Sequence, residues 1–409
     1  MSCFKAADIY LPNKDVDLKK WSVVACDQFT SDPTYWELVE HTVADAPSTL
    51  YITLPEIYLK EAQSRIPKIA QNMEDYVASG VLVPAVKDGF VLVERDTSSG
   101  KRLGIVGAID LEAYDFNKGA EVPVRCTEGT VAERLPVRTE IRSASLLECP
   151  HVMLLIDDPK KTLIESFYDK RESFRVLYDV DLMKQGGHLK GYALEGQTAL
   201  EVEHAFAEFY DKNSNFFLAV GDGNHSLAAA KICWENIKKT LTDDDQKNHP
   251  ARFALVEVVN LHSPALVFKP IHRIVSGVGL KEFTADFESF LERKGMKLVE
   301  GTDLILVSFG KKRFYDIKDS NGRLPVDIVQ EFLDKYMQNH PHILLDYIHG
   351  SIVTEGLSQK IETVGILLQP ISKDGFFDAI EAGGALPRKT FSMGEAEEKK
   401  YYMECRKIR

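Results

Sequence analysis

Short apolar runs alternate with amphipathic stretches along most of the chain. The runs are rich in Val, Ile, Leu and Phe and are short enough for buried strands. They are WSVVAC (21–26), FVLVERD (90–96), LGIVGAIDL (103–111), HVMLLID (151–157), NFFLAV (215–220), RFALVEVV (252–259), DLILVSF (303–309) and VGILLQP (364–370). We therefore expect a series of buried strands connected by other elements.

The stretches between these runs have the spacing of helices. Apolar residues recur every three or four positions in 198–212, 280–295 and 324–338, and Asp32-Pro33-Thr34 has the composition of a helix start. Alternating strands and helices predict the α/β class, as a mixed α+β sheet protein. We expect an N-terminal α/β lobe (1–120), a core lobe (121–280) and a C-terminal α/β lobe (281–409), with loops at 97–104, 184–191 and 242–250.

One segment breaks the pattern abruptly. Residues 215–231 read as an apolar run, then Gly221-Asp222-Gly223-Asn224-His225-Ser226, then an alanine-rich stretch. The run predicts a strand over 215–220. The stretch after it predicts a helix with one apolar face, formed by Leu227, Ala230, Trp234, Ile237 and Leu241. Residues 221–226 are therefore a strand-to-helix turn.

Such a turn suits an anion. Gly221 and Gly223 permit positive φ and close approach of a ligand, and the first N–H groups of a helix point outward with the positive end of its dipole. Asp222 can hold a metal or act as a base, Asn224 can bind a polar substrate, and His225 can contact phosphate or shuttle a proton. The alternative is structural: Asp222 or Asn224 caps the helix, and His225 is an ordinary polar residue.

Composition narrows the classes of partner. The 62 acidic and 50 basic residues give a net charge of −12, which argues against a nucleic-acid or anionic membrane surface. No stretch approaches the roughly 18 apolar residues of a membrane span, and no secretory leader is evident, so we expect a cytoplasmic protein. The six cysteines show no CxxC pair or zinc-like spacing and are expected to be free thiols.

Four segments carry a family resemblance. The turn resembles the Asp-Gly-His-His-Arg signature of the DUF1015 family. RCTEGTVAERLPVRTEIR (125–142) is similar to its His-Glu-x-Thr segment, with Arg125 near the histidine position, and FKPIHRIV (268–275) is similar to its Pro-x-His-Arg. LPRKTFSM (386–393) is similar to its Pro-x-Lys-Ser/Thr, and VVACDQF (23–29) is weakly similar to its Pro-Pro-Tyr-Asp.

The family turn in its own right resembles the phosphate-binding turn of the ParB/sulfiredoxin superfamily. That superfamily includes nucleotide hydrolases, sulfiredoxin and an ADP-dependent free-serine kinase. The resemblance implies a ParB/sulfiredoxin-like core and a nucleotide, ADP or ATP, whose phosphates lie at the turn. Ser226 departs from the family, which has arginine there, and a hydroxyl cannot replace the charge of a guanidinium.

Other basic residues are candidates to replace that arginine. Arg134, Arg138 and Arg142 recur every fourth position, although Pro136 and the β-branched residues argue against a regular helix, and a solvated basic stripe is the alternative. His272 and Arg273 lie in a predicted strand, whose alternation sends only one of them to a given pocket. Lys389 can neutralise phosphate near the C-terminus.

Together with the turn, the resemblance implies a nucleotide-dependent phosphotransferase acting on a small hydroxylated metabolite such as serine. Asp222, His225, Glu128 and His272 are the catalytic candidates, and Asp222 and Glu128 are the candidate Mg²⁺ ligands. The nucleotide-binding candidates are Gly221, Gly223, Asn224, Ser226, Arg134, Arg138, Arg273 and Lys389. The alternatives are a phosphate-ester or nucleotide hydrolase, in which water is the acceptor, and a non-catalytic nucleotide or metabolite sensor.

Overall fold

The computed structural model describes residues 2–24, 32–117, 119–150, 152–213, 215–319, 323–387, 389–394 and 401–409. The chain forms two units, of which the first comprises residues 1–267 with 394–409 and the second comprises residues 268–393. The second unit is therefore an insertion in the sequence of the first. This division differs from three successive lobes, because strands distant in the sequence share one sheet.

Helices occur in both units. In the first unit they are α1 (Leu18–Trp21), α2 (Pro33–Val43), α3 (Ala62–Ala78), α4 (Leu135–Ala144), α5 (Ile164–Tyr168), α6 (Gln197–Lys212), α7 (Asn224–Lys238) and α8 (Asp243–Asn248). In the second unit they are α9 (Leu280–Glu292), α10 (Pro325–Asn339), α11 (Ser351–Leu357) and α12 (Phe376–Gly383).

Strands also occur in both. The first unit contains β1 (Phe4–Lys5), β2 (Ala7–Pro12), β3 (Leu82–Thr97), β4 (Gly100–Asp110), β5 (Tyr114–Asp115), β6 (Val124–Cys126), β7 (Leu147–Glu148), β8 (Met153–Ile156), β9 (Val176–Asp181), β10 (His188–Leu194), β11 (Leu218–Asp222), β12 (Phe253–Asn260) and β19 (Arg406–Lys407). The second contains β13 (Phe268–Ser276), β14 (Lys297–Ser308), β15 (Lys311–Lys318), β16 (Leu344–His349), β17 (Thr363–Leu368) and β18 (Phe391–Met393).

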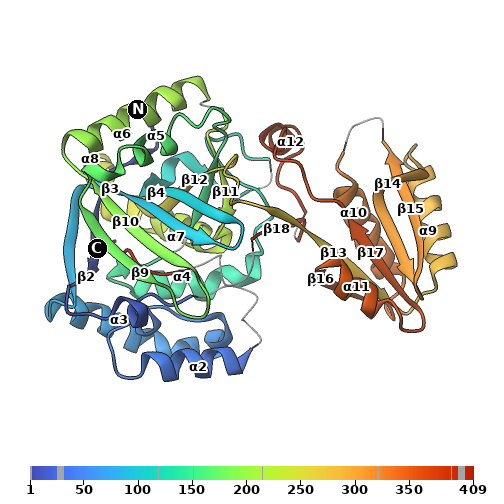
Figure 1. Ribbon diagram of the computed structural model, residues 1–409, viewed down its shortest axis with the longest axis horizontal. Coiled ribbons are helices and arrows are strands. Elements are labelled where there is room, and N and C mark those ends of the chain that lie inside the picture. Colours follow the sequence, from blue (N-terminus) through green and yellow to red (C-terminus); the bar gives the residue numbers. More distant parts are fainter. Residues whose placement is uncertain are drawn as a thin grey trace. The chain divides into compact units, whose positions relative to one another are not determined.

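A mixed sheet organises the first unit and confirms the predicted mixed α/β class. Its strand order is β5-β6-β11-β8-β12-β4-β3-β10-β9, with β1 added to β4 and β2 to β3. Strand alternation divides the core: Phe90 and Leu92 of β3 pack in one cluster with α5, α6 and α7, while Val91 and Val93 pack in another with α2 and α3. Figure 1 shows α5 and α6 on one side of this sheet and α2 and α3 on the other. Because both faces are covered, its strands read as continuous apolar runs.

The C-terminal residues 401–409 belong to this first unit. Tyr401, Met403 and Cys405 are buried in the same core cluster as α2 and α3. The indole N–H of Trp21 donates to the Met403 carbonyl at 3.1 Å, and β19 pairs antiparallel with β7. The first unit is thus completed by chain that follows the inserted second unit in sequence.

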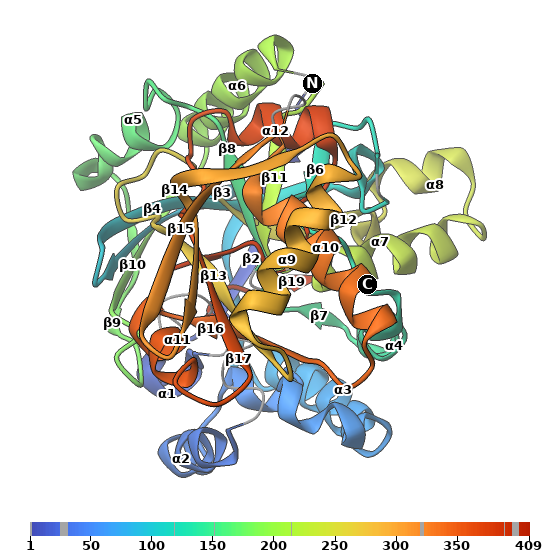
Figure 2. The same cartoon turned by 90° about the vertical axis from the view of Figure 1, so that its right-hand side faces the viewer.

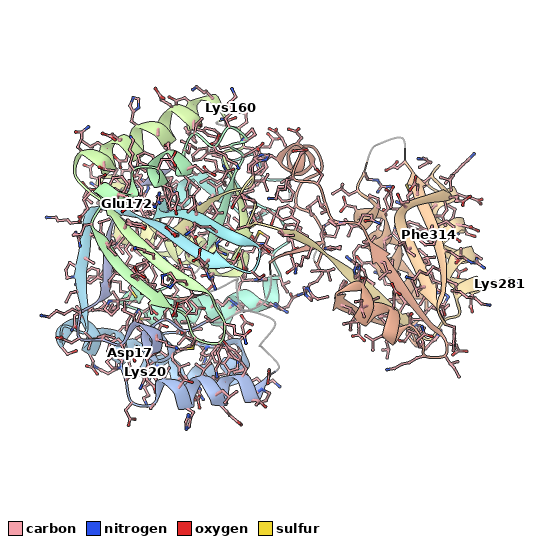
Figure 3. All side chains as sticks on the ribbon, viewed as in Figure 1. Asp17, Lys20, Lys160, Glu172, Lys281 and Phe314 are labelled. Carbon is pink, nitrogen blue, oxygen red and sulfur yellow. The ribbon has the colours of Figure 1, made fainter. Side chains whose placement is uncertain are left out.

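The second unit is an antiparallel sheet with helices on both faces. Its strand order is β15-β14-β17-β13-β16, and β18 pairs with β13. Apolar residues of α9 and α10 pack with Val364 and Ile366 of β17, whereas Gly365 of the same strand faces Thr354 and Ser358 at α11. Figure 2 shows α9 and α10 together on one face and α11 on the other. Phe314 on β15, labelled in Figure 3, is exposed.

Local signals explain two helix starts. The Asp17 carboxylate accepts the Lys19 N–H at 3.0 Å at the start of α1, where Asp17 and Lys20 are labelled in Figure 3. Asp32 accepts the Tyr35 N–H at 3.2 Å, and Pro33 occupies the first turn of α2, where its missing N–H removes no helical bond. The expected helix start at Asp32-Pro33 is therefore confirmed.

Four local expectations were wrong. The expected loop at 97–104 is a tight turn, because β3 ends at Thr97 and β4 begins at Gly100, and half of the expected loop at 184–191 belongs to β10. The apolar run 21–26 is not a strand in its described part, because Trp21 ends α1 and Val24 makes only an isolated bridge to Tyr401; Ala25 and Cys26 lie outside the described residues. The polar stretch 242–250 contains the short helix α8, because Thr242 accepts the Asp245 N–H at 3.3 Å and acidic residues fill the first turn.

We expect Gly187→Ala to destabilise the first unit by about 2–4 kcal/mol and Gly80→Ala by only about 1 kcal/mol. Both glycines have positive φ, 84° and 75°. A Cβ at Gly187 would lie 1.9 Å from the Asp96 carbonyl oxygen, whereas a Cβ at Gly80 would meet nothing within 4 Å. Urea unfolding of both variants separates the backbone collision from the φ penalty, and equal losses would refute this account.

Candidate functional site

The predicted strand-to-helix turn is present. β11 ends at Asp222, and Gly223 precedes α7 with φ 86°, in the left-handed region that favours glycine. The strand begins at Leu218 and includes Gly221, so it is shifted toward the turn relative to the expected 215–220. The pairing of β11 with β8 shifts register between Val220, opposite Leu154, and Asp222, opposite Met153, so Gly221 is the extra residue of a bulge at the end of the strand.

A second loop lies against this turn. β6 runs parallel to β11, with Val124 beside Leu218 and Cys126 beside Val220, so both strands end at the same edge of the sheet. The segment that follows β6, residues 127–131, therefore meets the segment that follows β11. We call residues 127–131 the β6 loop and residues 221–226 the β11 turn.

Three hydrogen bonds join the β6 loop to the end of β11 and to the β11 turn. The Thr127 hydroxyl donates to the Val220 carbonyl at 2.7 Å, and the Asn224 amide donates to the Glu128 carbonyl at 3.3 Å. The Val131 N–H donates to His225 Nε2 at 3.2 Å. Because Nε2 accepts, a neutral His225 ring carries its proton on Nδ1. The structure thus brings the segment that carries Glu128 against the turn that carries Asp222, Asn224 and His225, whereas the sequence offered them as two separate segments.

The start of α7 retains unused polar groups. No side chain caps this helix, and the Asp222 carboxylate instead accepts the Gly223 N–H at 2.7 Å. Among the described residues, the backbone N–H groups of Asn224 and Ser226 have no acceptor. The Asn224 side-chain oxygen is buried and has no hydrogen-bond partner within that part of the chain. The capping alternative therefore leaves these groups unexplained.

The three arginines at 134–142 do not form a solvated stripe. The segment is a regular helix, α4, contrary to the expectation from Pro136, because this proline lies in the first turn. Arg138 is paired with Glu56, and Arg142 with Glu148 at 2.7 Å. Arg134 is exposed, three residues after the β6 loop, and has no ion pair with any residue that the structure describes.

The remaining candidates belong to the second unit. Arg273 Nη2 donates to the Gln330 side chain on α10 at 3.2 Å, whereas His272 Nδ1 accepts the Leu368 N–H at 3.2 Å. Both side chains are buried and point to opposite faces of β13, as strand alternation requires. Lys389 is exposed. The catalytic role expected of His272 and the nucleotide-binding roles expected of Arg273 and Lys389 stay predictions.

The environment of His272 predicts a pH effect on the second unit. Burial, Arg273 and His349 lower the pKa of His272 from 6.5 to about 4. The unfolded chain therefore binds a proton between pH 6.5 and pH 4 that the folded chain does not. We expect stability to fall over this window as pH decreases, by about 3 kcal/mol for this group.

The variant His272→Asn provides the test. Its side-chain oxygen can still accept the Leu368 N–H, but it does not titrate. Unfolding monitored from pH 7 to pH 4 should lose part of its pH dependence in His272→Asn and keep it in His342→Asn, because His342 is exposed. Identical pH profiles for the wild type and His272→Asn would contradict the assignment.

The sequence interpretation missed a buried charged cluster in the first unit. Arg102 Nη2 lies 3.5 Å from the Glu257 carboxylate, and Arg95 donates to the Gly186 carbonyl at 3.0 and 2.8 Å. Glu404 is also buried and accepts a hydrogen bond from Tyr178. Burial raises the pKa of Glu404 to about 7, against the effect of that hydrogen bond. The available signal was a charge inside otherwise apolar runs, as in FVLVERD and RFALVEVV.

Two kinds of feature are absent from the described residues. No group of three or more His, Cys, Asp or Glu side chains in that part of the chain is arranged to hold a metal ion. None of the described helices has the length and apolar character needed to cross a membrane.

Comparison with known proteins gave one family and several distant structures. The sequence model of a family described as "Protein of unknown function (DUF1015)" matches residues 7–336, and no curated protein matches. A conserved hypothetical protein from Pyrococcus furiosus is 12% identical, with a TM-score of 0.37, over 72% of this chain and 93% of its own. A free serine kinase in complex with AMP is 13% identical, with a TM-score of 0.40, over 74% of this chain and 91% of its own. SbnI from Staphylococcus aureus, truncated at its C-terminus, is 9% identical, with a TM-score of 0.37, over 70% and 82%.

Proposed function

This chain belongs to the DUF1015 family, and from the groups assembled at the start of α7 we propose that it binds a nucleotide by its phosphates and transfers a phosphoryl group to a small hydroxylated metabolite. The observation that carries the proposal is the β11 turn itself. There a left-handed glycine and helix N–H groups that lack an acceptor among the described residues lie beside the β6 loop, and each of the two segments carries one acidic residue, Asp222 and Glu128.

The geometry of the turn supports the proposed phosphate binding. Gly223 keeps the approach to α7 clear of a side chain, and the Asn224 and Ser226 N–H groups can donate to phosphate oxygens along the helix dipole. A helix N-terminus attracts negative charge by typically 0.3–1 kcal/mol, so it orients a phosphate but does not hold it alone. We propose that the guanidinium of Arg134, which follows the β6 loop in sequence, supplies the positive charge that Ser226 lacks.

Phosphoryl transfer needs positioning and charge stabilisation more than covalent chemistry. His225 accepts the Val131 N–H through Nε2, so a neutral ring carries its proton on Nδ1, the atom that we propose donates to a phosphate oxygen. A carboxylate, Asp222 or Glu128, would accept the proton of the acceptor hydroxyl. A free amino acid with a hydroxyl side chain, such as serine, has the size and chemistry of such an acceptor.

The acidic residues of the two segments, Asp222 and Glu128, are suitable ligands for the Mg²⁺ that accompanies a bound nucleotide. Mg²⁺ is usually bound by one or two carboxylates together with water and substrate phosphates, and Asp222 and Glu128 offer two carboxylates on the adjacent loops. When bound, the ion would neutralise charge on the phosphates. The protein's part is to position these carboxylates, and Asp222 is fixed by its bond to the Gly223 N–H.

A thermal-shift experiment tests the nucleotide site. A ligand at 100 times its Kd stabilises the folded state by about 2.7 kcal/mol, which is readily seen as a rise in the unfolding midpoint. We expect ADP or ATP with Mg²⁺ to raise the midpoint of the wild type. The rise should disappear in His225→Ala and in Asn224→Asp, whose added charge repels phosphate.

The matched control is His204→Ala, an exposed histidine on α6 in the same unit. It should keep the full nucleotide shift. If no nucleotide shifts the wild type, or if the shift survives in both turn variants, the proposed site is wrong.

A hydrolase that uses the same groups to position water is the second candidate. Ser226 in place of arginine favours a third candidate, a non-catalytic sensor, because less positive charge at a phosphate-binding turn can mean lost chemistry. Release of inorganic phosphate in the absence of serine or another hydroxylated acceptor would favour the hydrolase, and acceptor-dependent consumption of nucleotide would favour the transferase.

A further inference from the structure

Two cysteines face each other across the strands that attach the C-terminal segment. β19 pairs antiparallel with β7, with Arg406 opposite Glu148 and Lys407 opposite Leu147. Continuing this register by one residue places Cys405 opposite Cys149. Both belong to the same buried core cluster, and both are free thiols in the structure.

The backbone hydrogen bonds show whether Cys405 and Cys149 are a hydrogen-bonded or a non-hydrogen-bonded antiparallel pair. The Ile408 N–H donates to the Leu146 carbonyl at 3.1 Å, so the even-numbered residues of this strand make the ladder bonds to the β7 side. Cys405 instead exchanges both its backbone bonds with Tyr10, at 2.9 and 2.8 Å. Cys405 and Cys149 are therefore a non-hydrogen-bonded antiparallel pair.

That pairing is suited to a covalent bridge. In non-hydrogen-bonded pairs the Cα atoms are about 4.5 Å apart and the side chains approach closely. A disulfide requires Cα atoms about 4.4–6.8 Å apart. We propose that Cys149 and Cys405 form a cross-strand disulfide under oxidising conditions, which fastens residues 401–409 to β7. This inference is independent of the proposed nucleotide site.

The bridge can form by thiol–disulfide exchange with a small-molecule disulfide such as oxidised glutathione. One cysteine thiolate attacks the oxidant and forms a mixed disulfide, releasing one small thiol. The second thiolate then attacks the cysteine sulfur of that mixed disulfide and releases the other. Two protein thiols and one small disulfide become one protein disulfide and two small thiols.

Burial controls the rate of this exchange. Desolvation raises the pKa of the Cys149 thiol well above its usual value, and the neighbouring Cys405 raises it further. Since the thiolate is the nucleophile, the closed structure reacts slowly. Exchange therefore requires transient opening of residues 401–409. The disulfide would form slowly and, once formed, would hold that segment against β7.

Peptide mapping of the full-length protein gives the direct test. After incubation with oxidised glutathione, followed by alkylation and digestion under non-reducing conditions, we expect one linked peptide pair containing Cys149 and Cys405. Its mass should be lower by two hydrogens than the sum of the free peptides. The thermal midpoint of the first unit should rise by about 10 °C and return when a phosphine reductant is added.

Cysteine variants make the result specific. Cys149→Ala and Cys405→Ala should each abolish both the linked pair and the reductant-sensitive shift. Cys233→Ala, another buried cysteine, should retain both. Absence of the linked pair after unfolding and refolding in oxidised glutathione, or linkage of Cys405 to any other cysteine, would overturn the proposal.

Discussion

Replacing Glu148 with Ala is expected to lower the free energy of unfolding of the first unit by about 3–5 kcal/mol. Glu148 is buried and accepts hydrogen bonds from Arg142 and Arg406, each at 2.7 Å, and from the Leu255 N–H at 2.8 Å. These partners lie on α4, β19 and β12. The substitution leaves two guanidinium groups and a backbone donor without their acceptor inside the protein.

Urea unfolding at neutral pH measures this loss, with Glu74→Ala as the control. Glu74 is exposed on α3 in the same unit, so its removal should change stability by less than about 0.5 kcal/mol. A loss below 1 kcal/mol in Glu148→Ala would show that the network is solvated or easily rearranged.

Glu148 also makes the free energy of unfolding of the first unit depend on pH. Burial alone would raise the pKa of Glu148, but Arg142 and Arg406 more than offset this and hold the pKa below its ordinary value. The folded state therefore binds fewer protons than the unfolded state in acid. The contribution of Glu148 is present above its unfolded pKa and is lost as pH falls, and Glu148→Ala should remove that part of the acid sensitivity.

Replacing Asp222 with Asn is expected to reduce phosphoryl transfer by about 100-fold or more, the usual range for losing an acid–base carboxylate. The amide oxygen can still accept the Gly223 N–H, so the turn keeps its shape while its charge is lost. The unliganded thermal midpoint, measured beside turnover, separates a loss of charge at the site from a loss of stability. Turnover of nucleotide in the presence of an acceptor is the measurement.

Asp211→Asn, at an exposed position near the end of α6, is the matched control and should keep full turnover. If Asp222→Asn were fully active while His225→Ala lost nucleotide binding, the turn would bind the nucleotide and the reactive carboxylate would lie elsewhere. Loss of activity together with a lowered midpoint would instead assign Asp222 a structural role.

The β11 turn could be predicted because its signals are local. An apolar run needs a strand and an alanine-rich amphipathic segment needs a helix, so two glycines between them mark a turn whatever surrounds it. The opposite orientations of His272 and Arg273 are local in the same sense, since strand alternation fixes them. The helix α4 was misjudged because Pro136 disrupts a helix interior but not a first turn.

The sequence did not predict which residues form ion pairs with its charged side chains. Arg138 and Arg142 look alike at a spacing of four, yet their carboxylates come from Glu56, far upstream, and Glu148. Likewise, nothing near Arg102 in the sequence indicates that Glu257 lies beside it on the neighbouring strand. Such pairs depend on which segments become neighbours in the folded chain. No single stretch of the sequence specifies that arrangement.

By itself the sequence determined the α/β class, the strand-to-helix turn with its candidate residues, and the family resemblance, because periodicity, glycine conformation and motif order are properties of short segments. Only the tertiary structure decided that the β6 loop meets the β11 turn, that residues 401–409 complete the first unit after a long insertion, and that Cys405 faces Cys149. These contacts join residues separated by roughly 90 to 400 positions. Their free energy comes from burial and pairing that exist only once the whole sheet has formed.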